Sequence, residues 1–180
     1  MGIRYDSLDE SVRSCMVQEL DADLQTGRLY ASPRLNDTGK KEWPETLREA
    51  LAEHDDSWLA NALRSMGLLN STVPKKNRDG TTSMTRMSVN AADTLAEGEF
   101  NRFYMRGLCV DVLKSGGTEV EVYRGKSVLV PRSESEAMIG QFLSAQQLLE
   151  SLRDSPGVKP ALGPPLGPNS GLTVRRTQRA

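Results

Sequence analysis

The sequence predicts an α+β fold dominated by helix, with about five helices, one small β-hairpin and an extended C-terminal arm. Apolar residues recur at helical spacing in five stretches, most clearly in 7–24, 89–114 and 133–154. Strict alternation of apolar and polar residues, typical of a half-buried strand, is confined to 118–130. Residues 156–171 contain five Pro and four Gly, so this stretch cannot continue a helix and should run extended.

Three helices are expected in the first third of the chain. Ser7 and Glu10 form a capping-box pair at the start of a helix over 7–24. Turn residues then predict a loop over 25–42, and Pro44, at a favoured first helical position, begins a short helix to about Glu53. The third helix is capped by Asp55 or Asp56 and stopped by Gly67.

Residues 70–87 are polar, basic and without periodicity, which predicts an exposed loop with a possible short hairpin around Asp79-Gly80. The main helix follows over about 89–114. Its apolar residues cover more than half of the helix circumference, so we expect it to be central and mostly buried. Gly98 and Gly107 inside it indicate either close approach of another backbone or a kink.

The last elements predicted are a hairpin, a helix and the arm. Strands 118–123 and 127–130 would be joined through Arg124-Gly125-Lys126, and a second capping box, Ser133 and Glu136, would begin a helix to about Asp154. We therefore predict one domain over 1–154 and an arm over 155–180, in which Leu172 and Val174 could form an edge strand.

Composition excludes several classes of protein. Leu, Ile, Val and Phe total 39 of 180 residues, enough for a thin core. One His and two Cys cannot build a zinc site of the His/Cys kind or a disulfide scaffold, and no cofactor is predicted. The absence of an 18-residue apolar stretch and of an apolar leader predicts a cytoplasmic protein with no membrane partner.

The net charge of −1 conceals an asymmetry, because residues 1–60 carry −6 and residues 61–180 carry +5. Basic side chains gather in the loop after the third helix and again near the C-terminus. A DNA-binding regulator would use them as phosphate contacts; the solvated basic loop is the simpler interpretation. The candidate nucleic-acid-binding residues are Lys75, Lys76, Arg78, Arg86, Arg175 and Arg176.

Catalytic motifs find little support. Gly125-Lys126-Ser127 lacks the preceding glycine of a phosphate-binding loop, and His54 has no serine-hydrolase elbow to serve. Asp111, Glu119 and Glu121, followed by Lys126, leave a metal-dependent nuclease as the third alternative, although the spacing departs from that pattern.

Arg102 and Arg106 lie four residues apart on a helix crowded with aromatic residues. Long cations in such a place need acidic partners or a route to water, and arginine with tyrosine is enriched at subunit interfaces. The predicted interface residues are Arg102, Tyr104, Arg106, Arg124, Arg132, Leu172 and Val174.

The function predicted first is therefore a non-enzymatic protein that self-associates or binds a partner, forming a homo-oligomer in which the arm contacts a neighbouring subunit by strand addition. Such arms suit assembly proteins, for example those of phages, by analogy alone. Nucleic acid is the alternative partner.

Overall fold

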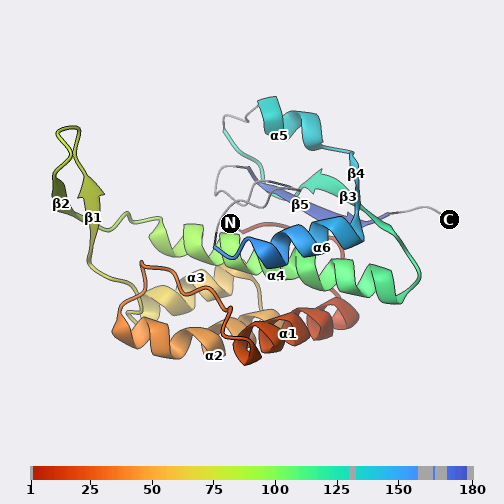
Figure 1. Cartoon of the computed structure of the whole chain (residues 1–180), viewed down its shortest axis with the longest axis horizontal. Helices are drawn as coiled ribbons and strands as arrows, with labels where there is room; N and C mark the ends of the chain where they lie inside the picture. Colours follow the sequence, from red (N-terminus) through yellow and green to blue (C-terminus); the bar gives the residue numbers. More distant parts are fainter. Residues whose placement is uncertain (1, 130–132, 158–163, 165–169, 178–180) are drawn as a thin grey trace.

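The structure, a computed structural model, describes residues 2–129, 133–157, 164 and 170–177. Three helices form one layer in Figure 1: α1 (Glu10–Gln25), α2 (Asp37–Glu53) and α3 (Asp56–Ser65). The long α4 (Ala91–Lys114) lies across them, and α6 (Ala145–Asp154) with a small sheet covers its other side. The predicted class, α+β with helix dominant, is confirmed; the described residues contain six helices, one more than expected.

α4 is the centre of the hydrophobic core, as predicted. Phe100, Phe103 and Tyr104 are almost completely buried, and α4 packs on α1, α2, α3, α6 and the sheet. A Cβ atom at Gly107 would lie 2.9 Å from the backbone nitrogen of Met16 in α1. The predicted close approach of another backbone at this glycine is therefore confirmed, because any side chain would push the two helices apart.

Two predicted helix starts are wrong. The cap of α1 is Asp9, whose carboxylate accepts a hydrogen bond from the Val12 nitrogen, rather than Ser7. α2 begins at Asp37, within the predicted loop 25–42, because Asn36 caps it and accepts a bond from the Gly39 nitrogen at 2.7 Å. Pro44 lies inside that helix, where it removes one backbone donor without ending it. Asp55 caps α3, and Gly67 follows its end with a φ of +64°, as expected.

The expected hairpin near Asp79-Gly80 is present and longer than predicted. β1 (Thr72–Lys76) pairs antiparallel with β2 (Thr82–Arg86) in a separate two-stranded sheet. Gly80 has a φ of +84° in the connecting turn, a backbone conformation that glycine adopts without strain. Figure 1 shows this hairpin standing away from the body of the molecule.

The main sheet differs from the predicted hairpin. β3 (Glu119–Arg124) is its central strand, flanked by β4 (Phe142–Ser144) and β5 (Leu172–Arg176), both antiparallel to it. Residues 127–129 form no strand, and position 130 lies outside the described residues. Instead, the nitrogens of Gly125 and Lys126 donate to the Gly171 carbonyl, which holds the β5 end of the chain against this turn.

The single helix predicted over 133–154 is two helices separated by β4. α5 (Ser133–Met138) stops before Gly140, which has a φ of +79°, and Ser144 then caps α6 by accepting a bond from the Gln147 nitrogen. A glycine in a left-handed conformation ends a helix. The helical spacing of apolar residues continues past this point in the sequence, although the helix itself does not.

The C-terminal segment returns to its own chain. Leu172 and Val174 are completely buried, and Val174 pairs with Val122 of β3. The edge strand predicted for these two residues is therefore present, and it pairs with a strand of its own chain; its addition to a neighbouring subunit stays a prediction. β5 shares one hydrophobic core with the helices.

Candidate functional site

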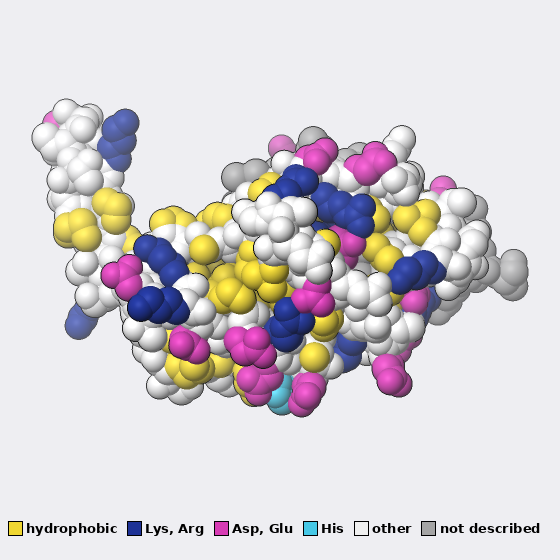
Figure 2. Space-filling view, turned by 60° about the horizontal axis from the view of Figure 1, so that its bottom comes forward, with side chains coloured by type: hydrophobic (Ala, Val, Ile, Leu, Met, Phe, Trp, Pro, Cys, Tyr) yellow, Lys and Arg dark blue, Asp and Glu magenta, His cyan; other side chains and the backbone are white. Residues whose placement is uncertain are grey.

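The basic hairpin, residues 71–87, is the most exposed element of the described chain. All ten residues of its two strands except Val73 are exposed, and the sequence 71–87 carries four bases and one acid. Figure 2 shows it projecting from the body with basic and hydrophobic side chains together. It brings four predicted nucleic-acid-binding residues onto one element: Lys75, Lys76, Arg78 and Arg86.

The two faces of the basic hairpin differ. Side chains of directly opposed residues lie on the same face, and faces alternate along the strands. Pro74 is opposite Met84, with Lys76 on one side of this pair and Arg86 on the other, all on one face. Met84 is 64% exposed. One face therefore presents an apolar pair between two cations.

The edges of the basic hairpin differ as well. Ser71 and Met87 form a hydrogen-bonded pair, as do Asn77 and Thr81. Because hydrogen-bonded and non-hydrogen-bonded pairs alternate in an antiparallel ladder, the backbone of Pro74 and that of Met84 face outward. The outer edge of β1 lacks a donor at Pro74, whereas the outer edge of β2 keeps its donors.

The cations of the basic hairpin have no acidic partner among the described residues. Arg175 and Arg176, predicted as a second nucleic-acid anchor, are placed differently. Arg175 pairs with Glu121 at 2.8 Å, and Arg176 pairs with Asp9 at 2.5 Å and Asp111 at 2.6 Å. The two arginines thus hold β5 against β3, α4 and the capping residue of α1, and their charge is neutralised within the chain.

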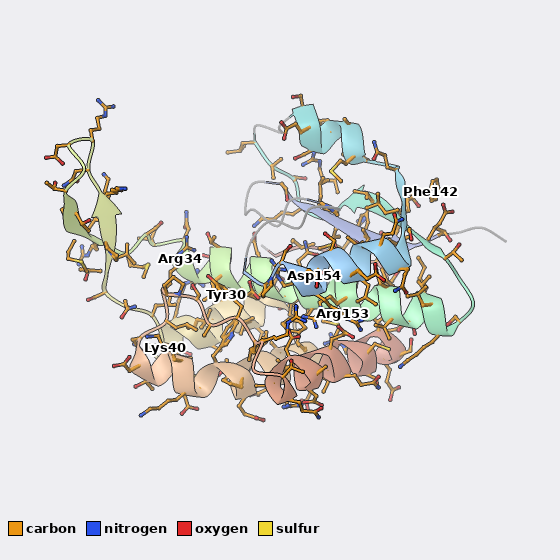
Figure 3. All side chains as sticks on the ribbon, in the orientation of Figure 1. Tyr30, Arg34, Lys40, Phe142, Arg153 and Asp154 are labelled. Atoms are coloured by element: carbon orange, nitrogen blue, oxygen red, sulfur yellow. The ribbon has the colours of Figure 1, made fainter. Side chains whose placement is uncertain are left out.

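At this same end of the molecule Figure 3 labels two further cations, Arg34 and Lys40, below the hairpin. Lys40 lies on α2 and is exposed, with a long 3.6 Å contact to Asp37. Basic side chains therefore extend from the hairpin toward its base.

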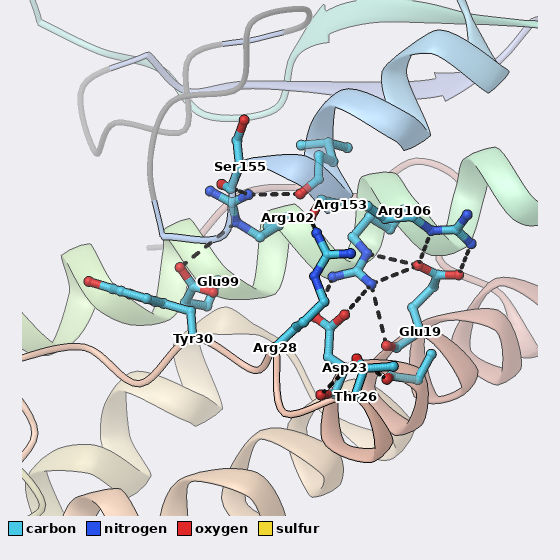
Figure 4. Close-up of polar contacts among 12 residues, drawn as sticks. Glu19, Asp23, Thr26, Arg28, Tyr30, Glu99, Arg102, Arg106, Arg153 and Ser155 are labelled. Atoms are coloured by element: carbon cyan, nitrogen blue, oxygen red, sulfur yellow. Dashed lines mark hydrogen bonds and ion pairs between the residues drawn. The ribbon is translucent and has the colours of Figure 1, made fainter.

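Arg106, a predicted interface residue, lies in a buried ionic cluster within one chain (Figure 4). Its side chain is 3% exposed, and its guanidinium pairs with Glu19 at 2.8 Å and with Asp23 at 2.6 Å, both from α1. Arg153 of α6 binds the other side of the Glu19 carboxylate. Burial alone would raise the pKa of Glu19, but the bonds from Arg153 and Arg106 outweigh it and lower that pKa.

Arg102 forms the second part of the cluster. It donates to the carbonyls of Leu152 and Ser155 and lies 4.0 Å from Glu99, one turn earlier on the same helix. Burial raises the pKa of Glu99 to about 7, and the charges of Arg102 and Arg106 only partly oppose this. Tyr104 is likewise internal, since its hydroxyl accepts from the Ser7 nitrogen.

The remaining predicted interface residues do not gather on one surface. Arg124 pairs with Glu136 of α5, Leu172 and Val174 are in the core, and Arg132 lies outside the described residues. Packing inside one chain thus accounts for the described members of the predicted interface set, including Arg102, Tyr104 and Arg106. The spacing of residues in the sequence could not distinguish such internal packing from an interface.

The carboxylates considered for a nuclease do not converge on one site, because two of them pair with separate basic side chains. Asp111 and Glu121 pair with β5, and Lys126 pairs with Glu97. No group of three or more His, Cys, Asp or Glu among the described residues is arranged to hold a metal ion. His54 stacks on Trp58 with ring centroids 4.2 Å apart, while Cys15 and Cys109 are buried and unpaired.

One polar site was missed by sequence reasoning. The carboxylate of Asp56, at the first residue of α3, is buried beside a cavity, and among the residues that the structure describes only its Oδ2 atom has a hydrogen-bond partner. Burial raises the pKa of Asp56 to about 6. In the sequence this residue is one of two adjacent cap candidates, so nothing distinguished it from a solvated aspartate.

No family model matches the chain, and comparison with curated proteins and with solved structures finds no match either. None of the helices in the described residues has the length and apolar character needed to cross a bilayer.

Proposed function

We propose that this chain is a non-enzymatic nucleic-acid-binding protein that contacts the phosphate backbone through the basic hairpin. The observation that carries this proposal is the group of four exposed, unpaired cations on an element that stands off the body. Phosphate contacts supply most of the affinity of such proteins, and a two-stranded ribbon fits a groove of a duplex.

The distribution of charge between the hairpin and the rest of the chain supports contact with nucleic acid through the hairpin alone. Residues 71–87 carry +3, so the rest of the chain carries −4. A polyanion is attracted to the hairpin and repelled by much of the remaining surface. The proline and methionine on the face with Lys76 and Arg86 are of the residue types that minor-groove proteins place against base steps.

The test is the salt dependence of binding to a fluorescein-labelled 20-base-pair duplex, followed by fluorescence polarisation between 50 and 200 mM NaCl. Four phosphate contacts give a slope of about −3.6 in log K against log salt concentration. Lys75→Gln with Lys76→Gln should reduce the slope to about −1.8.

The matched control is Arg4→Gln with Lys114→Gln, which makes the same change in net charge at exposed residues outside the hairpin. Its slope should equal that of the unmodified chain. Equal losses in both double variants would show that net charge, rather than the hairpin, governs binding, and absence of binding at 50 mM NaCl would reject the proposal.

A second candidate, self-association, is favoured by the outward-facing backbone of β2. Thr82, Met84 and Arg86 lie in non-hydrogen-bonded pairs, so their N–H and C=O groups could pair with β2 of a second copy. Met84→Pro removes one outward donor and leaves the ladder to β1 intact, as Pro74 already does. Light scattering should then show a dimer for the unmodified chain and a monomer for the variant; monomers in both cases would exclude this candidate.

A further inference from the structure

The cavity beside Asp56 has a volume of about 670 Å³. Its walls are α3, the first half of α4 and the residues just before α4, and Gly2 and Lys126 complete the lining. The lining is mostly polar, with serine, threonine and asparagine side chains between the charged ones. A cavity of this size accommodates a small molecule, and its polarity favours one that makes hydrogen bonds.

The charges in the lining are unbalanced at one position. Asp93 pairs with Arg64, and Glu97 pairs with Lys126, so these two carboxylates have a basic partner. Asp56 has none. Its Oδ2 atom accepts a hydrogen bond from the Ile3 nitrogen at 2.9 Å, while its Oδ1 atom is buried and has no hydrogen-bond partner within the described part of the chain.

The surroundings of Asp56 explain why its charge is not relieved by solvent. The residue is 1% exposed, and a Cβ atom at Gly2 would lie 2.1 Å from Oδ1, so the N-terminal segment covers one side of the carboxylate. An unpaired buried carboxylate is costly, and a cation with N–H donors supplies both the missing charge and the missing hydrogen bond.

We propose that this cavity binds a small primary amine as its ammonium ion, with Asp56 as the anionic partner. The ammonium approaches the Asp56 carboxylate from the cavity and donates one N–H to it, and the hydroxyl and amide groups of the lining accept or donate to the remainder of the ligand. An ammonium fits better than a metal ion, because the described residues do not provide three metal-ligating side chains in one place.

The probe is putrescine, titrated into the full ¹⁵N-labelled chain at pH 7.5 while amide chemical shifts are followed by NMR. Shifts should appear at Ser57, Asn61 and Glu97, and 1,4-butanediol, which has the same length without charge, should produce none. Asp56→Asn keeps an acceptor for the Ile3 nitrogen and should weaken binding at least tenfold, because a hydrogen bond to a charged group is lost. If the unmodified chain shows no saturable shifts with putrescine, the proposal is wrong.

Asp93→Asn is the matched control, since Asp93 lines the same cavity but is already paired with Arg64. It should change the affinity less than threefold. A loss equal to that of Asp56→Asn would show general attraction to an acidic surface and overturn the assignment to Asp56.

A second measurement needs no variant at all. The groups that act on Asp56 are Asp55 beside it, Glu97 on α4, Lys126 after β3 and Tyr5 in the N-terminal segment. With a pKa of about 6, Asp56 is mostly protonated at pH 5, so putrescine should bind about tenfold more weakly there than at pH 7. An affinity that does not change between these pH values contradicts the role of this carboxylate.

Discussion

Arg106 and Arg153 bind the same carboxylate from different environments. Both contact Glu19, but the Arg106 side chain is 3% exposed and that of Arg153 is 42% exposed. Arg106→Ala leaves Asp23 without its arginine partner and the buried Glu19 with Arg153 alone, and should lower the free energy of unfolding by about 3–5 kcal/mol. Arg153→Ala should lower it by about 1 kcal/mol or less. Urea denaturation of both variants checks the difference, and equal values would mean that burial does not control the strength of this cluster.

Glu99 should make stability depend on pH in the direction opposite to a surface carboxylate. Its pKa is about 7 in the folded chain, whereas a free glutamate side chain has a pKa of 4.5. Between these pH values the unfolded chain has lost a proton that the folded chain keeps, so the contribution of Glu99 falls as pH rises, by about 3 kcal/mol in all. Chemical denaturation of Glu99→Gln and of the unmodified chain should therefore show the variant gaining relative stability between pH 4.5 and 7. A difference constant with pH would contradict the raised pKa.

At the scale of elements, β5 should support the fold rather than an oligomer. Val174 is completely buried against β3, whereas Arg175 on the same strand lies at the surface of the sheet. Val174→Ala removes buried methyl groups and should lower the free energy of unfolding by about 2 kcal/mol, with no change in molecular mass by light scattering. Arg175→Ala, the control, should cost about 1 kcal/mol or less. A change of mass without a change of stability would restore an intersubunit role for this strand.

The elements that could be predicted are those specified by neighbouring residues. α1, α3 and α4 follow from helical spacing, and for α3 the cap and Gly67 also mark the ends; the hairpin turn follows from Asp79-Gly80. The partners of β3 could not be predicted, because pairing between positions so far apart in the chain depends on the closure of the whole core. The Pro/Gly-rich composition of the stretch before β5 is typical of an extended arm. This composition does not reveal whether the strand that follows packs on its own chain.

Some residues of the candidate sites could be predicted from the sequence, and others could not. Lys75, Lys76, Arg78 and Arg86 were found from charge alone, because four cations in a polar stretch need no tertiary information. Asp56 was missed because its chemistry comes from burial and from the N-terminal segment that covers it. Likewise, the acidic partners of Arg106 lie on α1, more than 80 residues away in the chain.

At the scale of the whole molecule, the core and the basic hairpin should be separable. The hairpin packs on no other helix or strand to any substantial extent, and Ser71 and Met87 are joined at its base by a 2.9 Å backbone hydrogen bond. Replacing residues 72–86 by Asn-Gly, a pair that favours a tight two-residue turn, therefore leaves Ser71 and Met87 in place. The core, built around α4, loses no buried side chain.

The free energy of unfolding of the shortened chain should lie within about 0.5 kcal/mol of that of the original, since surface changes away from packed groups have effects of this size. Its binding to the labelled duplex should be lost, because the four cations that are proposed to contact phosphates are gone. Thermal denaturation and fluorescence polarisation on the same preparation measure both properties. Putrescine should still shift the amide of Ser57, since Asp56 is untouched. A chain that keeps its stability and also keeps duplex binding would place the nucleic-acid interface elsewhere, whereas a large loss of stability would show that the hairpin is part of the fold.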